Sequence, residues 1–171
     1  PASVPLRFLI LSIGFTAALA FLPQPIKKVA GRLFPSKVVR KSHNTEQRIA
    51  ELGYELPPAV SPKGNYVLCT RSGNLVFTAG HIPKPADGDL MVGKIGADLT
   101  QEDGYKAAQI VALNLLSTLK AELGSLDRIK RIVKVVGFVN CVDGFAAQPA
   151  VINGASDLFV EILGERGVHA R

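Results

Sequence analysis

The chain has 171 residues, 47% hydrophobic and 20% charged, which is enough for one ordinary domain with a shorter appendage. Its formal net charge of +6 belongs to the head, because seven of the 20 basic residues and no acidic residue precede Glu46. The body keeps 13 basic against 14 acidic residues, a net charge near −1, so it lacks the basic surface of a nucleic-acid-binding domain and we expect no nucleic acid partner.

Residues 8–26 contain no charged side chain and lie between Arg7 and Lys27. As an α-helix they would span about 28 Å, close to the hydrocarbon core of a bilayer. We therefore expect residues 1–26 to be a membrane anchor in contact with lipid. Two alternatives remain open, an organellar targeting segment and a buried helix of a soluble domain.

The side of the membrane on which the body lies is predicted by the basic residues around the apolar run. Six of them follow it between positions 27 and 41, against Arg7 alone before it. By the positive-inside rule the body then faces the cytoplasm, matrix or stroma. We expect an organellar inner or thylakoid membrane, in a mitochondrion or chloroplast, or alternatively a bacterial inner membrane with the body on the cytoplasmic side.

Residues 27–45 are predicted to form a basic, amphipathic linker. Ile26, Val29, Leu33 and Phe34 recur at helical spacing, with lysine and arginine elsewhere on the turn. Such a helix can lie on anionic head groups. Packing against a partner subunit explains the pattern equally well.

The folded domain is expected over residues 46–171 and opens with a short helix at 45–52. A β-hairpin follows, in which the β-prone runs 66–71 and 75–78 are joined by Ser72-Gly73-Asn74, a sequence that suits a tight turn. The segment between the hairpin and position 98 is rich in proline and glycine and is expected to be a loop.

Two long helices and one more strand are predicted in the rest of the chain. Thr100 and Asp103 are placed to form a capping arrangement at the start of a helix that ends at Gly124. The Val-rich residues 130–140 indicate a buried strand, and a helix from Gln148 or Pro149 to Gly164 follows. With a last strand expected after Arg171, this order indicates an α+β fold with two helices on one face of a sheet.

The motifs of several enzyme classes are missing from the sequence. Cys69 and Cys141 are 72 positions apart, with no C-x-x-C pair and no histidine at ligand spacing, so we expect two free thiols and no metal. His43, His81 and His169 are isolated. No phosphate-binding loop, dinucleotide fingerprint or nucleophile elbow occurs, and no cofactor is expected.

Two phrases carry a family resemblance: GNYVLCTRSGNLVFTAGHIP at 64–83 and GVHAR at 167–171. Together they resemble the Rid family of YjgF-like proteins, and ELGYELPP at 51–58 is similar to a less characterised branch of it. The resemblance extends over residues 48–171 and implies a chorismate-mutase-like sheet with two helices on one face. It also implies deamination of reactive 2-imino and enamine acids without a cofactor, by homo- or hetero-trimers with pockets between subunits.

The resemblance implies five site residues. Arg171 matches the arginine that holds the substrate carboxylate, a role for which its fork of donors is suited. Tyr66 matches a pocket tyrosine, Asn153 an asparagine on the last helix, Gly80 a place where backbone donors approach the ligand, and His81 a position often occupied by glutamine. Each has a structural alternative: a surface ion pair for Arg171, hairpin packing, a solvent-facing helix position, a strand-ending turn, and a loop imidazole bonded to backbone.

The implied reaction is that of a 2-iminobutanoate/2-iminopropanoate deaminase-like hydrolase. Arg171 would fix the carboxylate and Tyr66 would close the apolar side, while polar groups near Gly80 and Asn153 orient the attacking water. Relatives carry a glutamate on the strand expected after Arg171. The alternative function is a non-catalytic accessory subunit of an organellar membrane complex. Ribonuclease activity, reported for some relatives, fits poorly with the near-neutral body.

Overall fold

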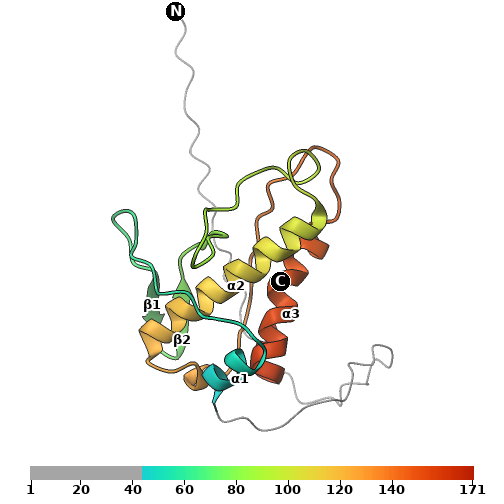
Figure 1. Cartoon of the computed structure of the whole chain (residues 1–171). Helices are drawn as coiled ribbons and strands as arrows, with labels where there is room; N and C mark the ends of the chain where they lie inside the picture. The colour runs from blue at the N-terminus through green and yellow to red at the C-terminus, as the bar shows by residue number, and fades with distance from the viewer. Residues whose placement is uncertain (1–43) are drawn as a thin grey trace, which may run out of the picture. The chain divides into compact units, whose positions relative to one another are not determined.

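The computed structural model describes residues 44–171, so the expected anchor at 8–26 and most of the linker lie outside the described residues. No helix within residues 44–171 is long and apolar enough to cross a membrane. The described part is an α+β domain (Figure 1). Its elements in chain order are α1 (Thr45–Glu51), β1 (Cys69–Ser72), β2 (Leu75–Thr78), α2 (Gln101–Leu123), the 3-10 turn η1 (Leu126–Arg128), α3 (Gln148–Leu163) and the 3-10 turn η2 (Gly164–Gly167).

The predicted hairpin is confirmed. β1 and β2 are antiparallel, with Cys69 opposite Thr78 and Ser72 opposite Leu75. The connecting turn places Gly73 at φ +56°, in the left-handed region that glycine adopts without steric cost. The first strand begins at Cys69, three residues later than predicted.

The two long helices also begin and end close to the predicted residues. At the start of α2 the backbone N–H of Asp103 donates to the Thr100 hydroxyl (3.1 Å), and the N–H of Thr100 donates to the Asp103 carboxylate (2.9 Å). These two bonds form a capping box, which satisfies N–H groups that the helix itself cannot pair. The helix α3 begins at Gln148 with Pro149 in its first turn, and Gly164 ends it.

The core lies mainly between α2 and α3, which cross at close range in Figure 1. A Cβ atom on Gly154 of α3 would overlap the backbone carbonyl of Tyr105 on α2, so glycine is what permits this approach. Ala112 and Leu116 of α2 are fully buried. The other buried apolar residues of this core are Ile49, Ala108, Leu126, Ile129, Ala155, Leu158, Phe159, Ile162 and Leu163.

The short helix α1 is attached to the rest of the domain by a polar cluster. The Thr45 backbone N–H donates to the Asp127 carboxylate (3.0 Å), and Arg166 donates to the Thr45 hydroxyl (2.8 Å). The Leu126 N–H donates to the Glu46 carboxylate (2.9 Å). The side chain of Thr45 is only 1% exposed, so these bonds replace the water that a buried hydroxyl would otherwise lose.

The prediction of a buried strand over residues 130–140 is wrong in two respects. Only Lys134 pairs within it, through an isolated parallel bridge to Ala170. Val133, Val136 and Phe138 are 61%, 64% and 94% exposed, because no part of the described chain covers their face. The opposite side is packed as expected, since a Cβ atom on Gly137 would meet the side chain of Ile152.

Candidate functional site

Three of the five predicted site residues lie in or near the hairpin, and His81 is the most firmly held. Its Nδ1 lies 2.9 Å from the carbonyl of Ala79 and its Nε2 lies 2.8 Å from the hydroxyl of Thr118 on α2. Because a carbonyl only accepts, Nδ1 carries the proton, and in the neutral ring Nε2 accepts from Thr118. The ring thus fastens the turn after β2 to helix α2, as its structural alternative suggested.

Tyr66 and Gly80 are the more open members of this group. The side chain of Tyr66 is 51% exposed, and its hydroxyl accepts from the backbone N–H of Lys63 at 3.4 Å. A Cβ atom added to Gly80 would meet nothing within 4 Å, so this glycine faces open space. Both positions are accessible to a ligand.

The other two predicted residues, Arg171 and Asn153, lie at helix α3. Arg171 is exposed and donates one hydrogen bond, from Nη1 to the carbonyl of Pro149 (3.2 Å). No carboxylate within residues 44–171 forms an ion pair with it. Asn153 is half-buried and lies one turn further along α3. The guanidinium therefore keeps most of its donors for another partner.

The chain does not bring its five predicted residues into one cluster. Tyr66, Gly80 and His81 belong to the hairpin side, which contacts α2, while Asn153 and Arg171 belong to α3. No hydrogen bond or ring contact joins the two groups within the described part of the chain. A pocket that uses both groups would need a second copy of the chain.

Sequence reasoning missed a polar pair beside Arg171. The Nε2 of His169 lies 3.0 Å from the Ser156 hydroxyl on α3, and its Nδ1 lies 2.6 Å from the carbonyl of Gly167. His169 looked isolated in the sequence because its partner belongs to a helix. The signal was nevertheless available, since Asn153 and Ser156 are three residues apart on one helical face.

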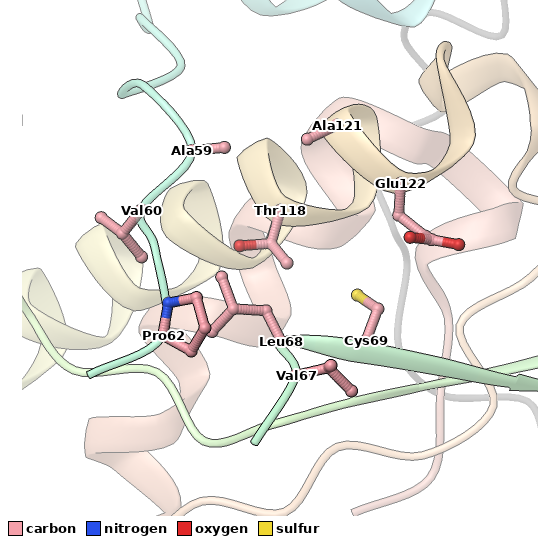
Figure 2. A pocket seen from close by; sticks show the side chains of 9 residues that line it. All are labelled: Ala59, Val60, Pro62, Val67, Leu68, Cys69, Thr118, Ala121 and Glu122. Carbon is pink, nitrogen blue, oxygen red and sulfur yellow. The ribbon is translucent and has the colours of Figure 1, made fainter. Parts of the chain in front are cut away.

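The largest cavity found lies elsewhere, between α2 and the segment that precedes β1 (Figure 2). Its volume is about 360 Å³, and none of the five predicted site residues lines it. Thr118, which binds His81, is part of its wall. The lining residues are Ala59, Val60, Pro62, Val67, Leu68, Cys69, Thr118, Ala121 and Glu122.

The chemistry of this cavity does not suit an acidic substrate. The only charged group in its wall is the Glu122 carboxylate, which pairs with Arg71 at 2.9 Å. Burial raises the pKa of the Cys69 thiol, and the negative charge of Glu122 adds to this while Arg71 opposes it. A mainly protonated thiol is a poor nucleophile. No group of three potential metal ligands occurs among the described residues either.

Comparison with known proteins assigns the family. The model of the family described as "YjgF/chorismate mutase-like, putative endoribonuclease" matches residues 46–171. The chain therefore belongs to the YjgF/chorismate-mutase-like, or Rid-type, family, and the expected Rid-like α+β fold is confirmed.

Three relatives show how far the similarity extends. The chain is 44% identical over 124 residues to Protein TCP17 of Trypanosoma cruzi, covering 72% of this chain and 78% of that protein. The crystal structure of a "putative endoribonuclease" from Shewanella oneidensis superposes with a TM-score of 0.72 at 37% identity, over 75% of this chain and 85% of that one. The protein Atu1372 from Agrobacterium tumefaciens, described as of unknown function, gives 0.68 at 43% identity, over 74% and 78%.

Proposed function

We propose that this chain is a Rid-type deaminase of small 2-imino acids, such as 2-iminopropanoate, whose pocket is completed by a second copy of the chain. The observation that carries the proposal is the exposed guanidinium of Arg171, which has no carboxylate partner among the described residues. An arginine fork binds both oxygens of a carboxylate and fixes the orientation of a small acid. Asn153, on the same helix that Arg171 contacts, is the nearest predicted polar group.

The proposed reaction needs positioning more than activation. With the carboxylate held by Arg171, the amide of Asn153 orients a water toward the imine carbon. The water oxygen bonds to that carbon, and the electron pair of the C=N bond moves to nitrogen, which takes up a proton. Loss of the water proton and cleavage of the C–N bond then release ammonia and the 2-oxo acid. An imine carbon is already electrophilic, so orientation supplies much of the rate enhancement.

Association of copies, as trimers in the family resemblance, is supported by the apolar side chains that the chain leaves uncovered. Phe77, Val92, Val136 and Phe138 are 54%, 74%, 64% and 94% exposed. Large apolar side chains left in water favour an interface. A neighbouring copy can cover them and can also bring the Tyr66 half of the site to the Arg171 half.

A second candidate function is favoured by the uncharged run at residues 8–26. If this run anchors the chain in an organellar inner or thylakoid membrane, with the body on the matrix or stromal side, the domain can serve as a non-catalytic subunit of a membrane complex. Such a subunit uses the apolar face for assembly and leaves Arg171 unused. Activity separates the two candidates.

The test follows the decay of 2-iminopropanoate, generated in situ, with the full chain and with Arg171→Ala. Loss of a charged contact to a buried carboxylate costs about 2–5 kcal/mol, so the rate should fall roughly thirty-fold to several thousand-fold. The control is Lys106→Ala, which removes an exposed cation of α2 that pairs with Glu102 at 3.9 Å, and should change nothing. Equal rates for wild type and Arg171→Ala would remove Arg171 from the mechanism. An inactive wild type would favour the accessory subunit.

A further inference from the structure

The segment that carries Arg171 is held against helix α3 by a histidine. The Nδ1 of His169 lies 2.6 Å from the Gly167 carbonyl, which fixes the proton on that nitrogen. Its Nε2 lies 3.0 Å from the Ser156 hydroxyl, and its ring meets that of Phe159 edge-on, with centroids 5.9 Å apart at 86°. Three contacts therefore define the position and the tautomer of this imidazole.

His169 and Arg171 share one face of the terminal segment. Ala170, between them, pairs its backbone with the segment at Lys134, so the chain is extended here. In an extended chain, residues two apart point to the same side. For His169 and Arg171 that side faces α3, as Figure 1 shows by the place of the C-terminus beside this helix.

The groups on α3 that meet this segment form a single stripe. Arg171 contacts the carbonyl of Pro149, and His169 contacts Ser156. Asn153 lies between these positions, four residues after the first and three before the second, on the same helical face. The contact of His169 is thus continuous with the proposed carboxylate site.

We propose that His169 is a positioning residue for Arg171, which through Ser156 fixes the terminal segment on α3 and so sets where the guanidinium meets the substrate carboxylate. This inference rests on the proposed function. Arg171 has only one contact of its own, a 3.2 Å bond to a backbone carbonyl, and that bond cannot fix a long, exposed side chain. His81 and Thr118 show the same arrangement on the hairpin side, where a ring bonded to the carbonyl two residues earlier binds a helix hydroxyl.

A double-mutant cycle on the full chain tests the proposal with 2-iminopropanoate as substrate. His169→Ala and Ser156→Ala should each raise KM on the order of tenfold with a smaller change in kcat, because a misplaced binding group weakens capture of the acid. Ser156→Thr keeps the hydroxyl and should restore KM. In the Arg171→Ala background, His169→Ala should add less than about a twofold change, because a residue that acts through another has no effect once that other is removed.

The control is Tyr54→Phe, which removes a hydroxyl bonded to Glu161 on the same helix (3.2 Å) and should leave KM unchanged. An unchanged KM in His169→Ala, or an equal rise in KM with and without Arg171, overturns the positioning role. If the wild type is inactive, the proposed function fails, and nitrogen NMR decides the inference separately. A shift of the Arg171 Nε–H signal in Ser156→Ala supports it, and an unmoved signal overturns it.

Discussion

The Nε2 of His169 lies 3.0 Å from the hydroxyl of Ser156, and this contact ties the last described segment to helix α3. The 2.8 Å contact of His81 with Thr118 does the same for the hairpin and helix α2. Each imidazole also meets the carbonyl of the residue two positions earlier. The two predicted halves of the site are thus each held on a helix by a histidine.

Replacement of Thr118 by valine should destabilise the domain. The side chain keeps its volume but loses the hydroxyl, which leaves the Nε2 of His81 without its partner beside a residue only 3% exposed. An unsatisfied polar group of this kind costs about 1–3 kcal/mol. Urea unfolding measures the loss, and Thr118→Ser, which keeps the hydroxyl, should retain most of the stability. Equal stability of Thr118→Val and wild type would contradict this.

The contact between α2 and α3 should not tolerate a side chain at Gly154. A Cβ atom there overlaps the backbone carbonyl of Tyr105, and backbone cannot move aside as a flexible side chain can. Gly154→Ala should therefore cost about 1–3 kcal/mol or more, as overpacked cores do. Gly80→Ala is the matched control for stability, since the added Cβ meets nothing within 4 Å. Thermal unfolding that gives the same midpoint for both variants would rule out the close approach.

The capping box of α2 should make part of the stability pH-dependent. The hydroxyl of Thr100, followed by its backbone N–H, holds the pKa of Asp103 below its ordinary value. A lowered folded-state pKa gives stability that is present above the ordinary pKa and is lost as the pH falls through the folded pKa. Thr100→Ala should cost about 1 kcal/mol near neutral pH through loss of the cap.

The difference between Thr100→Ala and wild type should shrink in acid, where Asp103 becomes protonated in both proteins. Urea unfolding at neutral pH and at a pH below the ordinary pKa of aspartate measures it. A difference that stays constant, or grows toward acid, would show that the carboxylate does not contribute to the cap.

The sequence predicted the helices and the hairpin well because their signals are local. Thr100 and Asp103 are three residues apart, and Gly73 marks its own turn. Residues 130–140 were harder, because apolar residues on both faces of a segment show that it is covered without showing by what. Phe138, 94% exposed in the single chain, indicates that the cover is another molecule.

The site could be predicted only residue by residue. The family resemblance led to Arg171 and Asn153, which do lie at one helix, and to Tyr66, which lies on the other side of the domain. It could not lead to the pair of His169 and Ser156, because their contact depends on how the segment after η2 folds back on α3. Spacing along the chain carries no such information.

Mixing two inactive variants tests most directly whether the site is shared between copies. Tyr66→Ala and Arg171→Ala each damage one half of the proposed pocket. If the halves come from different copies, oligomers assembled from both variants contain some sites with both halves intact. Random assembly of equal amounts restores about a quarter of the sites, since each half is intact in one copy of two.

The measurement is the rate of 2-iminopropanoate decay after the two variants are unfolded together and refolded, with native mass spectrometry to show that mixed oligomers form. Our account predicts a rate near a quarter of the wild-type value, against almost none for either variant refolded alone. A mixture that contains mixed oligomers but stays as inactive as the separate variants, while the wild type is active, would contradict a pocket shared between Tyr66 of one copy and Arg171 of another.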